Sequence, residues 1–369
     1  MKRGRLKLSP AFLIFSISGL ISLLIFGVLF GVIHILAGSL DTQNMAKRWS
    51  KSEESRAAQV SVFFSENLGT SEDEILNFEH RLDSALVEAS IVNTSENPDS
   101  RLWIDAYSAT GTITLEKGDK NVSVSAIGVG GEFFQFHPLK LESGSYFSGN
   151  DVMQDYCVVD EEIAWQLFGS NDIAGQIITI KGVPHIITGV IERQQDRLSK
   201  AAGLDSSVVY VSYNTLVNYG RANSICCYEI VMPNPVKNYA FNYLKEQLGS
   251  NEAESEVVEN TSRYGLLSLL QVLREFGTRS MNGKAIIYPY WENVARGYED
   301  ILATLLLVAV IFLLYPLVLV IIALRKAWVR RTWTAKSVYL KIKDKWERFL
   351  EKRRALRLEK KHQKKGKKS

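Results

Sequence analysis

Two long uncharged stretches dominate the hydrophobic pattern, one near each end of the chain. Residues 301–324 read ILATLLLVAVIFLLYPLVLVIIAL, and residues 11–37 read AFLIFSISGLISLLIFGVLFGVIHILA. A bilayer core about 30 Å thick is crossed by about 20 apolar residues in a helix. The pattern therefore predicts two transmembrane helices, at 11–37 and 301–324, separated by a large polar region.

Between the two stretches, helical and strand patterns alternate. Ser71 and Glu74 match a capping box, so a helix is expected from there. Residues 57–64 are expected to continue the first membrane helix outward, while 101–107 and 112–115 are expected to be strands around a turn at Gly111.

Short strands broken by glycine predominate from residue 128 to residue 216, and helical periodicity returns after it. The strands are expected at 157–159, 177–180, 186–191 and 208–211. We therefore predict an α+β extracytoplasmic domain between two transmembrane α-helices, with a first lobe at 41–127 and 217–298 and an inserted β-rich lobe at 128–216.

The distribution of charge gives the two stretches an orientation. Residues 1–10 carry four bases and no acid, residues 325–369 carry 19 bases and 4 acids, and the remainder carries 21 bases and 36 acids. Basic segments beside membrane spans stay in the cytoplasm. We expect a cell-membrane protein whose termini, 1–10 and 325–369, are cytoplasmic. A cleaved signal peptide is the alternative for 11–37, although its 27 residues exceed the usual length.

Three residues within the membrane stretches each allow two interpretations. Gly27 and Gly31 form a GxxxG pattern, which favours close helix packing, although an ordinary lipid-facing helix fits as well. Pro316 interrupts the second stretch and is a candidate hinge, although prolines are also tolerated in membrane helices without that role.

The cysteines are Cys157, Cys226 and Cys227, all in the extracytoplasmic part. Adjacent cysteines rarely bridge each other, because neighbouring side chains of a strand point to opposite faces. Two interpretations remain: three buried apolar side chains, or a disulfide between Cys157 and one of the pair.

The basic tail contains a predicted amphipathic helix. Trp346 and Phe349 share a helical face with Val338, Ile342 and Leu350, among lysines and arginines. Such a helix is typical of contact with anionic lipid headgroups. We therefore expect the tail to bind membrane lipid through Trp346 and Phe349, and we expect no nucleic-acid partner.

Sequence signatures of catalysis are missing from the chain. It contains no GxxxxGK[ST] phosphate loop, no HExxH metal motif and no GxSxG nucleophile motif. We expect a protein that is not an enzyme and that needs neither a cofactor nor a metal of its own.

The segment from Gly144 to Val190 resembles a known domain. The pieces in order are GSYFSGND (144–151), VVDEEIA (158–164), LFG (167–169), DIAG (172–175), IITIKG (177–182) and ITGV (187–190). They are similar to the extracytoplasmic core domain of MacB-type ABC transporter permeases, which are related to LolC, LolE and FtsX. The match departs from the family at 172–176, where the usual Asp-Pro-Ile-Gly-Lys appears as DIAGQ.

This resemblance implies a porter-like α/β lobe with an inserted β-rich lobe between the first two membrane spans. It also implies a dimer that takes energy from an ABC ATPase subunit and passes it outward as movement. The family has four spans and this chain has two, so the resemblance implies a truncated, two-span version that needs a further permease subunit.

Two functions are therefore expected from the sequence. The first is a permease-like subunit or accessory of a MacB/FtsX-type ABC transporter complex, coupling a cytoplasmic ATPase to movement of the extracytoplasmic domain. The alternative is a stand-alone two-span extracytoplasmic sensor or binding protein.

Overall fold

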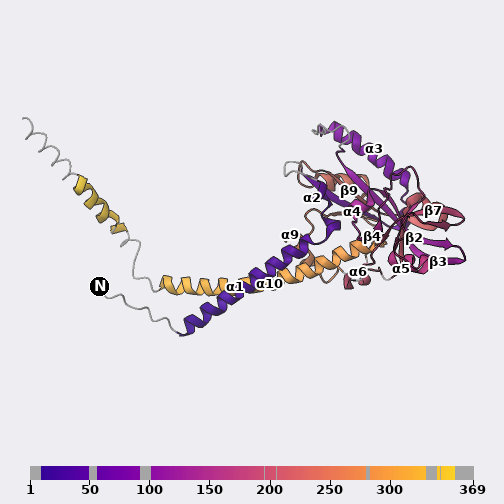
Figure 1. Ribbon diagram of the computed structural model, residues 1–369. Coiled ribbons are helices and arrows are strands. Elements are labelled where there is room, and N and C mark those ends of the chain that lie inside the picture. Colours follow the sequence, from indigo (N-terminus) through magenta and orange to yellow (C-terminus); the bar gives the residue numbers. More distant parts are fainter. Residues whose placement is uncertain are drawn as a thin grey trace, which may run out of the picture. The chain divides into compact units, whose positions relative to one another are not determined.

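The computed structural model describes residues 10–49, 56–91, 101–194, 196–204, 206–279, 283–329, 339–340 and 342–353 (Figure 1). The chain divides into two compact units. One comprises Leu29–Val308, and the other comprises Met1–Val28 with Ala309–Ser369. Each is described separately below.

A single mixed sheet forms the centre of the unit Leu29–Val308. Its strand order is β10-β1-β9-β2-β3-β8-β5-β7-β4, and β6 pairs with β2 and β7. Pairing is parallel between β3 and β8 and between β5 and β7, and antiparallel elsewhere. The strands are β1 Ala57–Phe64, β2 Ile104–Lys117, β3 Lys120–Gly131, β4 Leu141–Gly144, β5 Tyr156–Asp160, β6 Ile177–Ile180, β7 Val183–Ile191, β8 Val208–Ser212, β9 Arg221–Pro233 and β10 Ser255–Glu259.

Short helices connect or cover these strands. They are η1 Asp41–Gln43, α2 Met45–Trp49, η2 Glu66–Leu68, α3 Glu72–Glu88, α4 Phe133–Phe136, α5 Glu161–Phe168, α6 Arg197–Ala201, α7 Tyr213–Tyr219, α8 Tyr239–Gln247 and α9 Leu266–Glu275. Ser71 caps α3 in the predicted capping box with Glu74. Gly169 ends α5 in the left-handed conformation with φ of 74°.

Three apolar clusters hold the sheet and helices together. The helices α3 and α8 bury Phe78, Leu82 and Leu244 against strands β1 and β9. The helices α5 and α7 cover strands β5 to β8. The third cluster contains the aromatic residues of α4 together with Trp291. Burial of these side chains, each worth about 1.5–3 kcal/mol, is the main stabilising term for the fold.

The structure corrects two predicted elements. Residues 57–64 form β1 and not a continuation of the first membrane helix. This strand lies between β10 and β9, and nearly all of its side chains are buried, so the alternating pattern of a half-exposed strand is absent. Gly111 is not a turn, because it lies inside the long strand β2. A Cβ at Gly111 would lie 2.3 Å from the Arg221 carbonyl oxygen, so the glycine permits close strand pairing.

The α+β class is confirmed, and its two predicted lobes share one sheet. Strand β3 crosses the predicted boundary at residues 127 and 128, and it pairs with β2 on one side and β8 on the other. The β-rich segment therefore extends the same sheet, since its strand β8 adds directly to β3.

Two helices among the described residues are long and apolar enough to cross a membrane. They are α1 Pro10–Gly38 and α10 Tyr290–Val329. The first agrees with the predicted 11–37. The second begins eleven residues before the predicted 301–324, because the polar residues 290–300 continue the same helix.

Candidate functional site

The helix α10 starts inside the unit Leu29–Val308. Its first residues, 290–300 (YWENVARGYED), precede the uncharged stretch that begins at Ile301. Four of them, Trp291, Glu292, Ala295 and Glu299, are buried. We call residues 290–300, with the side chains that bind them, the α10 junction.

Arg263 is the centre of the α10 junction. Its two terminal nitrogens each lie 2.7 Å from an oxygen of Glu292, and its Nε lies 2.6 Å from Oε1 of Glu299. Glu292 and Glu299 are seven residues apart, about two helical turns, and so face the same side of α10. Arg263 also donates to the side-chain oxygen of Gln43 in η1, at 3.3 Å. One buried guanidinium thus joins α10 to the segment that follows α1.

Further ion pairs surround this centre. Arg296 lies 2.8 Å from Glu292 and 2.7 Å from Glu256 of β10, and its guanidinium lies 3.8 Å from the centre of the Tyr288 ring. Arg279 pairs with Glu299 and, at 2.8 Å, with Asp300. Lys284 lies 3.2 Å from Glu256, which completes a set of four bases and four acids.

Pairing offsets the effect of burial on the pKa values of Arg263 and Glu256. Burial alone would lower the pKa of the Arg263 guanidinium, but Glu292 outweighs it and raises that pKa above its usual value. Burial would likewise raise the pKa of Glu256, but Arg296, Tyr288 and Lys284 outweigh it and lower that pKa. The charges of the α10 junction therefore compensate one another. Removing a single partner from a buried pair costs about 3–5 kcal/mol.

Aromatic contacts attach the first turn of α10 to the sheet. The Trp291 ring lies 5.6 Å from the Phe133 ring and 4.5 Å from the His137 imidazole, measured between centroids. His137 Nε2 hydrogen-bonds the buried Glu229 of β9, which also accepts from Ser61 of β1 at 3.0 Å. The start of α10 is thereby connected, through His137 and Glu229, to strands β9 and β1.

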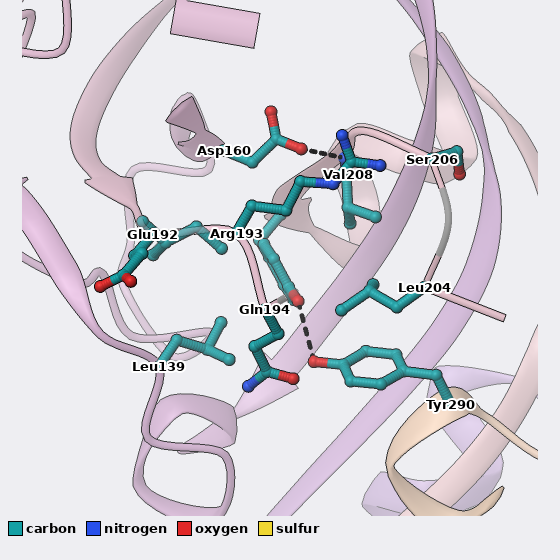
Figure 2. A pocket seen from close by; sticks show the side chains of 11 residues that line it. Leu139, Asp160, Glu192, Arg193, Gln194, Leu204, Ser206, Val208 and Tyr290 are labelled. Atoms are coloured by element: carbon teal, nitrogen blue, oxygen red, sulfur yellow. Dashed lines mark hydrogen bonds between the residues drawn. The ribbon is translucent and has the colours of Figure 1, made fainter. Parts of the chain in front are cut away.

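A small cavity adjoins this first turn (Figure 2). Tyr290 of α10 and Tyr210 of β8 line it, and their hydroxyl oxygens are 3.3 Å apart. Asp160 caps α5 through the Ile163 N–H and also accepts from the Val208 N–H, each at 2.9 Å. The cavity volume is about 20 Å³, enough for about one water molecule and too small for an organic ligand. It belongs to the packing of the junction.

Comparison with known proteins places this architecture in a family. Residues 21–240 match the MacB-like periplasmic core domain. The chain belongs to this family. The match ends before Arg263 and α10, so the α10 junction lies outside the matched residues.

Curated relatives are named macrolide export ATP-binding/permease protein MacB. The protein from Neisseria gonorrhoeae is 29% identical over 113 residues, which are 30% of this chain and 17% of the relative. The protein from Shewanella sp. is 28% identical over 179 residues, 47% of this chain and 26% of the relative. This MacB-like chain thus aligns with about a sixth to a quarter of their length.

Solved structures include two similar domains. The periplasmic region of MacB from Actinobacillus actinomycetemcomitans has a TM-score of 0.36 and 16% identity, covering 58% of this chain and 92% of that structure. The extracellular domain of the transporter YknZ from Gram-positive bacteria has a TM-score of 0.35 and 16% identity, covering 54% and 99%.

The two glycines predicted to pack helices lie open. A Cβ added at Gly27 or Gly31 would meet no described atom within 4 Å. Gly19 is the glycine at a close approach, because a Cβ there would lie 3.2 Å from Leu319. Helix pairing through Gly27 and Gly31 stays a prediction, because no described residue of this chain packs beside either glycine. The observed contact lies two turns earlier on α1.

Pro316, the predicted hinge, lies inside α10 beside this contact. Proline has no N–H to donate to the carbonyl four residues earlier, which belongs to Phe312. The Ser22 hydroxyl of α1 donates to that carbonyl at 2.7 Å, and Ser18 and Tyr315 hydroxyls are 2.9 Å apart. The neighbouring helix thus satisfies the oxygen that the proline leaves unpaired.

The three cysteines are free and buried, so the predicted disulfide alternative is corrected. Cys157 packs in the cluster under α5 and α7, whereas Cys226 and Cys227 of β9 pack in the cluster that contains Trp291. Burial raises the pKa of the Cys226 thiol to about 11 and raises the other two pKa values further. In the structure, all three cysteines are small apolar core residues.

Trp346 and Phe349 lie in the tail on a described helical segment, 342–353. Their ring centroids are 5.9 Å apart, and both side chains are exposed. The predicted amphipathic partner Val338 lies outside the described residues. Contact of this face with lipid stays a prediction.

The local sequence pattern does not predict the α10 junction. The available signal was the pair Glu292 and Glu299, two turns apart and directly before an uncharged stretch. Its partner Arg263 is distant in sequence, and nothing in the local pattern around Arg263 indicates burial.

Proposed function

We propose that this chain is a membrane-anchored, permease-like subunit or accessory of a MacB/FtsX-type ABC transporter complex. In this proposal it couples a cytoplasmic ATPase to movement of its extracytoplasmic domain. Family membership supports the permease class, and two long apolar helices support attachment to a membrane. The work of the chain is mechanical, with ATP hydrolysis supplied by the partner.

The α10 junction is the observation that carries the coupling part of the proposal. Because α10 runs without interruption from Tyr290 to Val329, displacement of its membrane segment is passed to residues 290–300. Those residues form an ion pair with Glu256 of β10, and Arg263 links them by hydrogen bonds to η1. Trp291 packs in the apolar cluster that includes side chains of the central sheet. Interfaces packed in this way move as units, so the domain follows the helix.

The orientation in this proposal follows from charge. Both basic termini lie in the cytoplasm, within reach of an ATPase, and the acidic domain lies outside. The family resemblance adds a further permease subunit that supplies the remaining spans, and a dimeric assembly.

Purification from native membranes in a mild detergent, after chemical crosslinking, tests the partner. We expect an ABC ATPase and a four-span permease to copurify with the full chain. Recovery of neither, together with binding of a defined extracytoplasmic ligand, would support the sensor alternative instead.

The coupling itself is tested on that complex with a fluorescent thiol probe at Val152, which is 99% exposed. The native cysteines are buried, so a V152C variant is labelled selectively. We expect ATP to change the emission of the probe, and Arg263→Met to reduce that change strongly. The exposed Arg274→Met is the matched control. An ATP response that persists unchanged in Arg263→Met would contradict transmission through the junction.

A further inference from the structure

The helix α9 presents apolar residues on two sides. Leu269 and Val272 are buried against the domain, whereas Leu266, Leu267 and Leu270 are 60%, 77% and 45% exposed. Leu266 and Leu270 are four residues apart and so lie next to each other on the helix surface. Exposed apolar residues gathered on one short helix indicate a contact surface, whereas single exposed residues are ordinary.

Both ends of α9 are held at one level of α10. Before α9, the Tyr264 hydroxyl donates to the Ala295 carbonyl at 3.3 Å. After α9, Arg279 pairs with Glu299 and Asp300. The segments that flank α9 are therefore held at residues 295–300, immediately before the uncharged stretch that begins at Ile301.

This level corresponds to the membrane surface. At 1.5 Å per residue, Ala295 lies about 9 Å from Ile301 along the helix axis, and Asp300 is adjacent to it. Each polar headgroup layer of a bilayer is roughly 5–8 Å thick. Once Ile301 begins the apolar span, residues 296–300 lie within the outer headgroup layer and Ala295 lies at its outer edge.

We propose that α9 is an interfacial helix that rests on the outer leaflet of the phospholipid bilayer. Leu266, Leu267 and Leu270 contact the boundary between headgroups and acyl chains. Phe276 and Ile287, which are 52% and 71% exposed, are further exposed apolar side chains on the segment leading back to α10.

This contact fixes the depth of the α10 junction relative to the bilayer. Tyr264 and Arg279 connect α9 to the same turns of α10 that Arg263 binds. The inference rests on α10 crossing the membrane and does not require an ATPase, so it can fail while the proposed coupling holds.

A depth measurement on the full chain in phospholipid nanodiscs tests the inference. An environment-sensitive NBD probe is attached to an L267C variant, and the nanodiscs contain phosphatidylcholine and phosphatidylglycerol, with or without a lipid that is spin-labelled near the headgroup. We expect a blue-shifted emission, at least about twofold quenching by the spin-labelled lipid, and protection from iodide. The control is V87C on α3, where the native side chain is 69% exposed and no lipid quenching is expected.

Equal accessibility of the two probes to iodide, with no quenching by the spin-labelled lipid, would overturn the inference. The inference would also be overturned if the L267C probe were protected from iodide only with two copies per nanodisc and without lipid quenching. That result would indicate that a second copy of this chain covers α9. A second variant separates contact from folding: Leu270→Glu should reduce lipid quenching at the L267C probe. The neighbouring exposed Gln271→Glu should not, with helix content equal in both.

Discussion

Arg263 shows how a single buried side chain connects distant parts of this protein. Its guanidinium donates to Gln43, Glu292 and Glu299, which come from the segment after α1 and from two turns of α10. Planar geometry allows it to bind Glu292 with two parallel bonds, which a lysine could not do.

Replacing Arg263 by Met is expected to destabilise the domain by about 3–5 kcal/mol, because buried Glu292 and Glu299 would lose their buried partner and keep only the more exposed Arg296 and Arg279. Thermal unfolding of the full chain in detergent measures the loss. The triple variant Arg263→Met, Glu292→Gln, Glu299→Gln should recover part of it, since the unpaired carboxylate charges are removed while Arg296 and Arg279 keep Glu256 and Asp300 as partners. The exposed Arg274→Met should stay within about 0.5 kcal/mol of the native protein. A full loss in the triple variant would contradict the electrostatic cause.

Asp105 gives a prediction for pH. It is buried beneath α3 next to Glu79, and burial followed by the charge of Glu79 raises the pKa of the Asp105 carboxyl well above its usual value. The folded domain therefore holds this proton more tightly than the unfolded chain does. Its contribution to stability is complete below the ordinary pKa of about 3.9 and is lost as the pH rises toward the folded value.

The variant Asp105→Asn should therefore show a shallower decline in melting temperature between pH 5 and pH 8, and Glu79→Gln should act in the same direction. Differential scanning fluorimetry across that range measures both. The exposed Asp73→Asn of α3 serves as the control. A slope in Asp105→Asn equal to that of the native protein would exclude this carboxyl as the source.

At the scale of elements, the contact between α1 and α10 depends on small and hydroxyl side chains. Gly19 and Ser22 of α1 face Leu319 and the Phe312 carbonyl of α10. The sequence indicated small residues on this helix, but the GxxxG pattern directed attention to Gly27 and Gly31. Which small residues meet the partner helix depends on how the two helices are rotated relative to each other. The spacing of residues along the sequence does not determine this rotation.

Leucine at position 19 is expected to destabilise this helix pair by about 1–3 kcal/mol, because its Cβ would already be 3.2 Å from Leu319. Gly27→Leu is the matched control, since a Cβ there meets no described atom within 4 Å. Thermal unfolding in detergent compares them. If the Gly27 variant loses as much stability as the Gly19 variant, the packing face has been misassigned or another chain covers Gly27.

The tail helix gives a second prediction at this scale. Serine at Trp346 and Phe349 should weaken binding of a peptide covering residues 338–353 to anionic vesicles, because both exposed rings are removed. Vesicle co-sedimentation measures this, with zwitterionic vesicles for comparison. Unchanged binding would indicate that the rings serve a protein partner.

At the scale of the whole molecule, the division of charge predicts how the chain crosses the membrane. Cysteines introduced in the exposed extracytoplasmic loop at Val152 and in the tail at Lys352 should behave oppositely toward an impermeant thiol reagent. In intact cells or spheroplasts only the V152C variant should be labelled, and permeabilisation should expose the K352C variant. Labelling of both in intact cells would contradict a cytoplasmic C-terminus.

The sequence by itself determined the features that depend on local composition. These include the two apolar helices, the capping box at Ser71, the short strands of the β-rich segment and the resemblance to the MacB core domain. Each arises from neighbouring residues, because helix period, strand alternation and turn chemistry act over a few positions.

Only the tertiary structure decided which of these pieces meet. It showed that residues 57–64 are a central strand, since a strand buried on both faces has no alternating pattern. It joined both predicted lobes in one sheet and placed Arg263 against Glu292 and Glu299. Buried and exposed ion pairs are formed by the same residue types. Whether a pair is buried depends on which distant segments pack around its charges, and the local sequence does not show this.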